Sequence, residues 1–209
     1  MYEVYADSIA RAHSEAVARV IEFGEKVITE NGKETLELQS PLAITVTHPN
    51  IAPFRHNEYK YSQRMLDEYV PEITTEFNKG FSYTYGERLH KYNGSLDQIA
   101  IIIDKLQRAP NSRRAIAITW TPFVDAFSDE PPCLQNVQFI NRFGELNMIA
   151  MFRSNDICQA WGANAYGLMR LQEHVAELIK VKIGTLTTIS NCAHVYESDL
   201  QDAKRIAYL

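Results

Sequence analysis

The sequence predicts an α+β fold, and three observations support this prediction. Apolar residues recur at helical spacing in four segments, and they alternate with polar residues or form short apolar runs in six others. The order of these segments is α, β, β, α, α, β, β, β, α, β, which is not a regular βαβ alternation. Helices are expected over residues 1–25, 62–77, 95–109 and 164–179, and strands over residues 35–38, 44–47, 115–120, 133–140, 146–152 and 185–195.

Residues that favour helix ends and turns support these boundaries. Ser8 is expected to be the N-cap of the first helix. Ser40-Pro41 separates the first two strands. Ser95 and Gln98 have the spacing of a capping box that opens the third helix, and Pro110 ends that helix.

The second half of the chain is expected to contain a hairpin, a long helix and a last strand. Residues 141–144 are expected to form the turn of the hairpin. Apolar positions of the helix over residues 164–179 share one side, as in a helix that packs on a core. A short charged tail follows the last strand.

Composition and charge restrict the class of protein. A chain of 209 residues with 45% apolar and 22% charged residues suits one globular domain over residues 1–209. A net charge of −5 argues against a surface that wraps nucleic acid. Because no apolar run is long enough for a membrane span and no leader pattern opens the chain, we expect no membrane partner and a cytoplasmic location. Cys133, Cys158 and Cys192 lack CxxC spacing, so neither a disulfide framework nor a metal site is expected.

Two motifs in the second half indicate chemistry. Pro131-Pro132-Cys133 holds a thiol rigidly at the start of a strand, and Arg153-Ser154-Asn155-Asp156 offers a cation, a hydroxyl and a carboxylate. This set suits a nucleophilic thiol that faces a phosphorylated substrate. Arg113-Arg114 adds local positive charge, which favours a small anionic ligand. Taken alone, a free cysteine is more often a small buried hydrophobe, and an Arg-Arg pair is more often solvated.

From residue 113 onward the chain resembles the thymidylate synthase family. Besides these motifs, Asn164 opens the long helix and His194-x-Tyr196 ends the last strand, in the family's order and spacing. Residues 83–86, Tyr-Thr-Tyr-Gly, are similar to an upstream element of the family, and the short length is most similar to archaeal members. The resemblance implies a thymidylate synthase-like fold, a mixed β-sheet covered by helices, with one sheet face used for dimerisation.

The resemblance also implies the reaction, which is reductive methylation of dUMP to dTMP. The thiolate of Cys133 would add to C6 of uracil, and Arg153 is the cation that would favour the thiolate. A methylene-tetrahydropterin, of the tetrahydrofolate or the methanopterin type, would supply the one-carbon unit and the hydride. Tyr85 is implied in proton removal from C5, and Asp156 is implied beside the base and the pterin. No metal is implied.

Arg113, Arg114, Arg153 and Ser154 resemble the family's phosphate clamp. Members of the family donate the paired arginines across a dimer interface, so the resemblance implies a homodimer with shared active sites. Three guanidinium groups and a hydroxyl match a dianionic phosphate.

Three further residues resemble the contacts to the nucleoside. The amide of Asn164 complements N3–H and O4 of uracil, although the position would equally suit a helix N-cap. His194 and Tyr196 face the same side of a strand and resemble the pair that holds the ribose 3′-hydroxyl. Tyr196 could equally be a strand-end aromatic residue without that role.

The chain departs from the family's pattern at several positions. Leu134 follows the cysteine where many members have histidine, and Glu34 stands where a phosphate-binding arginine is common. Glu58 and Glu68 are both candidates for the glutamate that orders water. The chain ends 13 residues beyond Tyr196, so the segment that closes over folate in bacterial enzymes is not expected.

Other functions remain open from sequence. One is a pyrimidine-nucleotide (dCMP or dUMP) hydroxymethylase on the same fold, in which water rather than hydride ends the reaction. Asn164 argues against cytosine, since aspartate would suit its amine better. Another is a nucleotide-binding paralogue with weak activity. A thiol hydrolase that uses Cys133 with His194 would explain neither the clustered arginines nor Asn164.

Overall fold

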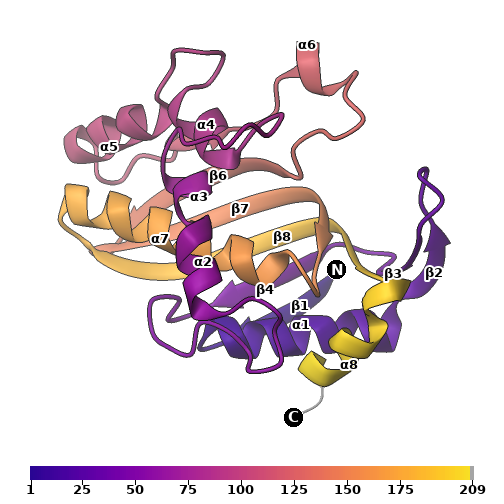
Figure 1. Ribbon diagram of the computed structural model, residues 1–209. Helices are drawn as coiled ribbons and strands as arrows, with labels where there is room; N and C mark the ends of the chain where they lie inside the picture. Colours follow the sequence, from indigo (N-terminus) through magenta and orange to yellow (C-terminus); the bar gives the residue numbers. More distant parts are fainter. Residues whose placement is uncertain (208–209) are drawn as a thin grey trace.

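The computed structural model describes residues 1–207, which form a mixed sheet with helices packed on it (Figure 1). Eight strands make one sheet, whose main order is β1-β4-β8-β7-β6-β5, with β3 paired to β8 and β2 paired to β3. The pairs β1–β4 and β7–β8 are parallel, and the other pairs are antiparallel. The strands are β1 (Tyr2–Ala6), β2 (Glu25–Ile28), β3 (Glu34–Glu37), β4 (Leu42–Val46), β5 (Ile116–Ile118), β6 (Leu134–Arg142), β7 (Glu145–Asp156) and β8 (Lys182–Tyr196). The predicted α+β class with a mixed sheet is therefore confirmed.

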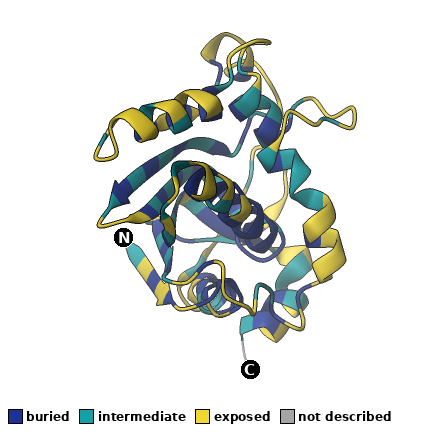
Figure 2. Ribbon diagram, turned by 90° about the vertical axis from the view of Figure 1, so that its left-hand side faces the viewer, coloured by how far each residue is buried: buried dark blue, intermediate teal, exposed yellow. Residues whose placement is uncertain are grey.

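The helices that pack on the sheet lie on one of its faces (Figures 1 and 2). The long helix α7 covers β7 and β8, and α1 covers β1, β4 and β8. None of the helices within residues 1–207 is long and apolar enough to cross a membrane. The helices are α1 (Ile9–Phe23), α2 (Gln63–Tyr69), α3 (Pro71–Thr74), α4 (Tyr85–His90), α5 (Gln98–Arg108), α6 (Pro122–Asp125), α7 (Trp161–Ile179), the 3₁₀ turn η1 (Glu197–Asp199) and α8 (Leu200–Ala207).

Polar anchors tie α7 to the sheet. The buried amide of Gln172 donates hydrogen bonds to the carbonyls of Leu146 and Thr185, at 2.7 and 3.0 Å. At the other end of the helix, the Trp161 indole donates to the Thr188 hydroxyl at 2.9 Å. Because these groups are buried and would otherwise lack partners, the anchors set the position of the helix along the strands.

The amino-terminal residues are a strand, which corrects the expected helix over residues 1–25. Residues 2–6 pair in parallel with β4, and α1 begins only at Ile9. Ser8 is the N-cap, as predicted, and its hydroxyl accepts from the Arg11 backbone N–H. The sequence pattern of a five-residue strand is weak, because the strand is stabilised by pairing with a distant segment. The helical periodicity of the residues that follow is stronger and therefore determined the prediction.

Two other helical expectations are also corrected. The helix expected over residues 62–77 divides at Pro71, which lacks a backbone N–H and begins α3 after α2 has ended. Ser95 is not a cap, because the side chain of Asp97 accepts from Ala100 N–H at 2.9 Å. Gln98 instead donates its amide to the carbonyls of Arg88 and Ile118, and so ties α5 to α4 and β5.

The charged carboxyl-terminal tail forms η1 and α8. Ala203 and Ile206 are buried, and α8 packs along α1. Its charged residues Asp202, Lys204 and Arg205 occupy the remaining sides. Because α8 is only eight residues long, its amphipathic pattern is too short to distinguish a helix from a charged tail in the sequence.

Among residues 1–207, no helix covers the second face of the sheet. Strand register brings a row of Ile118, Asn136, Met151, Ile189 and Ala43 onto this face, and the parallel row contains Ile116, Gln138, Ile149, Thr187 and Thr45. Ile116 and Ile118 are exposed. A partly apolar sheet face without a cover is typical of a surface that pairs with another molecule.

A buried ion pair joins α4 to the segment that leads to β6. Arg88 donates to both carboxylate oxygens of Asp125, at 2.8 and 3.2 Å, and to the Thr121 hydroxyl at 2.7 Å. Asp125 also accepts from the Thr121 backbone N–H at 2.5 Å. The side chains are 16% and 2% exposed, so neither charge has full access to water.

We predict that Asp125→Ala lowers the free energy of unfolding by about 3 kcal/mol, because the Arg88 charge would remain buried without its partner. Urea unfolding of the purified protein measures this change. Glu15→Ala is the matched control, since it breaks a pair with Arg11 whose side chains are 63% and 40% exposed, and it should change stability little. Equal shifts for the two variants would contradict the prediction.

Candidate functional site

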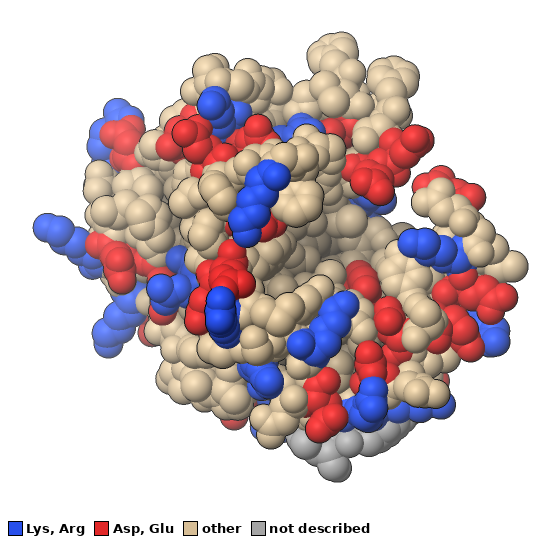
Figure 3. Space-filling view, in the orientation of Figure 1, with Lys and Arg blue, Asp and Glu red and all other residues tan. Residues whose placement is uncertain are grey.

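Three adjoining cavities form a cleft at the carboxyl-terminal ends of β7 and β8, and Figure 3 shows a hollow on this side of the molecule. The first, of about 550 Å³, lies between α2 and the start of α7. The second, of about 510 Å³, lies beside β3 and η1, and the two share Lys60, Asp156 and Gln159. The third, of about 280 Å³, shares Tyr69 and Glu72 with the first. We refer to these cavities together as the cleft.

Cys133 stands immediately before β6 and is half-buried. Its backbone carbonyl accepts from Arg153 N–H at 2.8 Å. The Arg153 guanidinium donates to the carbonyls of Pro132 and Pro131, at 3.1 and 2.8 Å. The two motifs predicted to act together are therefore in direct contact, and Arg153 holds the segment that carries the thiol.

The ionisation of Cys133 depends on two opposing effects. Burial raises the pKa of the Cys133 thiol, and the positive charge of Arg153 lowers it. Burial, followed by repulsion from a Cys133 thiolate, raises the pKa of Tyr85 well above its usual value and that of Tyr83 to about 12. At neutral pH both hydroxyls keep their protons, and they can donate hydrogen bonds to groups near the sulfur.

Asp156 lies in the wall common to the first two cavities. Its Oδ1 accepts from the backbone N–H groups of Cys158 and Gln159, each at 3.0 Å. Burial raises the pKa of the Asp156 carboxyl, while these hydrogen bonds and His194 lower it. With Oδ1 engaged by the backbone, Oδ2 is the oxygen left for a ligand.

His194 and Tyr196 lie at the end of β8, opposite the end of β7. Asp156 pairs in register with His194, and the Ser154 hydroxyl is 3.5 Å from His194 Nδ1. The rings of His194 and Tyr196 meet edge to face, with centroids 5.1 Å apart. Lys33 Nζ lies 5.4 Å from the Tyr196 ring centroid and lines the second cavity.

Asn164 is in the first turn of α7, and the structure excludes the N-cap interpretation. The helix begins at Trp161 with Ala160 as its cap, and Asn164 is 6% exposed. The Tyr69 hydroxyl donates to Asn164 Oδ1 at 2.8 Å. Sequence reasoning did not find Tyr69, because nothing local links residues that are 95 positions apart.

Arg113 and Arg114 do not reach this cleft within one chain. They are exposed residues that lead into β5, and they line a separate hollow of about 530 Å³ with Lys105, Asn111 and Ser112. Of the other predicted site residues, Tyr85, Asp156, Asn164 and Tyr196 line the cleft. Cys133, Arg153, Ser154 and His194 line none of its three cavities, and Cys133 is linked to the cleft through Tyr85, whose pKa a Cys133 thiolate raises. The phosphate clamp inferred from sequence is therefore divided in the monomer.

Glu58 and Glu68, the two candidates for the water-ordering glutamate, have less suitable positions for that role than Glu72. Glu58 is exposed and lines none of these cavities. Glu68 lines the first cavity, but it is exposed and pairs with Arg64 at 2.8 Å. Glu72 lines both the first and the third cavity, and its side chain is 17% exposed. It lies in α3, so its position depends on the helix break at Pro71.

The cleft offers contacts for flat heteroaromatic ligands and little for a metal. In the portion of the chain that is described, no three His, Cys, Asp or Glu side chains converge as metal ligands. The first cavity combines aromatic and apolar walls with the Asp156 carboxylate and the Gln159 amide. Such a mixture suits a ring system with polar edges.

Known proteins resemble this chain over most of its length. The sequence profile of the thymidylate synthase family matches residues 44–207. Proteins named "putative thymidylate synthase" are 39% identical in Methanosarcina barkeri, over 94% of this chain and 90% of the relative, and 35% identical in Methanothermobacter marburgensis, over 98% and 97%. A protein of the same name from Methanopyrus kandleri is 39% identical over 93% of each chain. With this profile match and these relatives, the chain belongs to the thymidylate synthase family.

Proposed function

We propose that this protein is a thymidylate synthase that converts dUMP to dTMP by reductive methylation. The observation that supports this most directly is the contact between the Cys133 segment and Arg153. Tyr85, whose pKa is raised by a Cys133 thiolate, connects this contact to the cleft, which is also lined by Asn164, Asp156 and Tyr196. A nucleophile, a cation and base-facing polar groups are thereby gathered around one space.

The Cys133 thiolate attacks C6 of the uracil ring, and the C5=C6 electron pair moves toward C5 and O4. A bound methylene-tetrahydropterin would transfer its methylene carbon to the nucleophilic C5, and the bond from that carbon to the pterin nitrogen would break once C5 has lost its proton, a step that Tyr85 assists. The hydride would then reduce this carbon to methyl while the Cys133–C6 bond breaks, which releases the thiolate and restores the ring. The pterin supplies the methylene group and the hydride. Because burial raises the pKa of Cys133, the charge of Arg153 is the feature of this chain that favours the reactive form.

The nucleotide contacts follow the two strand ends. Arg153 and Ser154 bind the phosphate, and His194 and Tyr196 hold the ribose. Arg153 uses one N–H each of Nε and Nη2 on the proline carbonyls, so both N–H groups of Nη1 and the second one of Nη2 are available for phosphate. This division lets one guanidinium hold the thiol segment and bind the substrate at the same time.

The active protein is a homodimer that pairs through the uncovered sheet face. Family members are typically dimeric. The exposed isoleucines on this face support the same arrangement, as does the distance of Arg113 and Arg114 from their own cleft. Each subunit lends these two arginines to the phosphate site of its partner.

The cosubstrate is a reduced pterin of the folate or methanopterin type, bound in the first cavity beside Asp156. The volume of about 550 Å³ and the Tyr61, Met65 and Leu66 walls fit a flat ring, and Asp156 accepts from its N–H groups. Glu72, rather than Glu58 or Glu68, is the carboxylate that orders water, since its side chain is shielded and borders both the first and the third cavity.

We predict that the protein releases tritium from 5-tritiated dUMP when a methylene-tetrahydropterin is supplied, and that Cys133→Ser abolishes this release. The serine hydroxyl is too weak a nucleophile to replace a thiolate. The variant should still bind dUMP in calorimetric titration. Mass analysis of the product separates dTMP from a hydroxymethylated nucleotide, and the latter would identify a hydroxymethylase instead. Substantial turnover by Cys133→Ser would sink the covalent mechanism.

The charge of Arg153 should be visible in the reactivity of Cys133. We predict that Arg153→Met moves the pH profile of Cys133 alkylation by iodoacetamide to higher pH, because only burial would then act on the thiol pKa. Arg153→Lys keeps the charge and should stay close to the unmodified profile. Peptide mass spectrometry gives the alkylation rates, with the buried Cys158 as an internal reference. Coincident profiles for the Met variant and the unmodified protein would contradict this account.

Mixing two inactive variants tests whether the sites are shared. Cys133→Ser and Arg114→Ala chains, mixed in equal amounts, should recover about a quarter of full activity, because half of the dimers are hybrids with one intact site. A mixture of Cys133→Ser with Arg153→Ala is the control, and it should recover nothing, since those two residues serve the same site from one chain. If confirmed hybrid dimers of the first mixture stay inactive, the arginines are not shared.

A further inference from the structure

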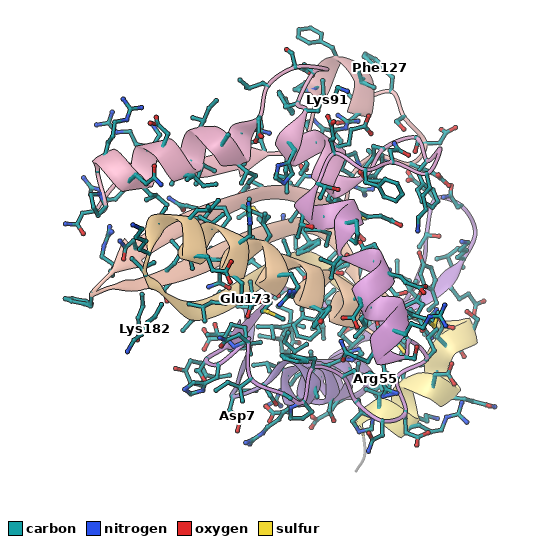
Figure 4. The ribbon with its side chains drawn as sticks, turned by 60° about the vertical axis from the view of Figure 1, so that its left-hand side comes forward. Asp7, Arg55, Lys91, Phe127, Glu173 and Lys182 are labelled. Carbon is teal, nitrogen blue, oxygen red and sulfur yellow. The ribbon has the colours of Figure 1, made fainter. Side chains whose placement is uncertain are left out.

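The Tyr69–Asn164 hydrogen bond connects the two helices that border the first cavity. Tyr69 is the last residue of α2, and Asn164 is in the first turn of α7; these helices are in contact, and they lie next to each other in Figures 1 and 4. The hydroxyl donates to Oδ1 at 2.8 Å, and both residues line the cavity. Asn164 is 6% exposed, so this bond is made where water competes little.

The bond determines which end of the amide is left for a ligand. A carboxamide has one acceptor oxygen and one donor NH₂ group, and the two exchange places when the amide turns over. With Oδ1 held by Tyr69, the Asn164 NH₂ group makes no hydrogen bond with residues 1–207. The donor end is therefore the end available to a ligand, while Oδ1 retains a second lone pair.

Tyr69 is well suited to act as a donor. Burial, followed by the negative charge of Glu72, raises the pKa of its hydroxyl, so the proton stays on the oxygen at neutral pH. Leu134, the residue after Cys133, is fully buried and brings no polar group to this region. Among the described residues, Tyr69 is the side chain that hydrogen bonds to the Asn164 amide.

We propose that Tyr69 is a specificity-determining positioning residue, which holds the Asn164 amide with its NH₂ group toward the ligand and so selects a 4-oxopyrimidine over a 4-aminopyrimidine nucleotide. This inference rests on the proposed function, because it assigns the ring in the cleft to a pyrimidine. Tyr69 acts through Asn164 and need not touch the nucleotide.

The selection follows from the pattern of donors and acceptors. O4 of uracil accepts from the Asn164 NH₂ group, and N3–H donates to the free lone pair of Oδ1. The 4-amino group of cytosine would instead face that NH₂ group, and only a turned amide could accept from it. In the turned amide, the NH₂ group could donate to the Tyr69 oxygen, but the Tyr69 hydroxyl proton would lose the acceptor that it has within residues 1–207, and this loss opposes the change. Without the Tyr69 hydroxyl, the amide is free to match either ring.

The test compares dUMP and dCMP binding by calorimetric titration in three proteins. The unmodified protein should bind dUMP at least about tenfold more tightly than dCMP, and Tyr69→Phe should reduce that ratio by about tenfold. Tyr166→Phe is the matched control and should leave the ratio unchanged, because the Tyr166 hydroxyl also joins α7 to α2, by donating to Asp67 at 2.7 Å, but Tyr166 does not line the cleft. Thermal unfolding checks that each variant is folded.

The same substitution made in an Asn164→Ala protein separates an effect of Tyr69 on the orientation of the Asn164 amide from an effect on the packing of the cleft. In Asn164→Ala there is no amide to orient, so adding Tyr69→Phe should not change the dUMP to dCMP ratio. If Tyr69→Phe weakens both nucleotides by the same factor, Tyr69 supports the cleft but does not select the base, and the inference is wrong while the proposed function stands. If the unmodified protein binds neither nucleotide, the proposed function itself fails, and this inference fails with it.

Discussion

The parallel pairing of β7 with β8, spanned by α7, is the constraint on which the rest of the cleft depends. Parallel strands end at the same edge of a sheet, so Ser154 and Asp156 at the end of β7 meet His194 and Tyr196 at the end of β8. The same connection starts α7 at this edge and brings Asn164 beside them. Buried anchors from the helix to the strands keep this register, because slipping would leave their polar groups unpaired.

Burial gives the cleft its chemical character. It raises the pKa of Cys133, Asp156 and the nearby tyrosines, which favours the protonated form of each group. Arg153 is the cation that opposes this effect at the sulfur, and it also holds the two proline carbonyls before the cysteine. A single guanidinium thus connects the position of the thiol with its ionisation. A lysine could supply the charge but not the two parallel hydrogen bonds.

The distance of Arg113 and Arg114 from Arg153 and the uncovered sheet face are explained together by the proposed dimer. Arg113 and Arg114 lie beyond the cleft of their own chain, and the face beside them carries exposed isoleucines on β5. In the proposed phosphate site, a single chain would supply Arg153 but not Arg113 or Arg114. In the proposed dimer, burial of an apolar surface and completion of an anion site occur in the same step, which links assembly to substrate binding.

The sequence by itself determined the features that depend on near neighbours. The Ser8 cap, the hairpin turn at residues 141–144 and the approximate course of α7 follow from local propensity and periodicity, and the Cys133 and Arg153 motifs could be recognised as candidate chemistry. Tertiary structure decided what depends on distant partners. Residues 2–6 became a strand because β4 pairs with them. Glu72 came to border the cleft because Pro71 starts a new helix there.

The same distinction applies to the base-facing amide. Sequence could propose Asn164 as a partner for uracil, but not the direction in which its amide points. That direction depends on Tyr69, which lies 95 residues earlier in the chain. Local propensity is set by interactions within a few residues, whereas such a contact exists only after two helices have packed on one sheet. Packing therefore decided the orientation of an amide that the sequence could only propose as a contact to the base.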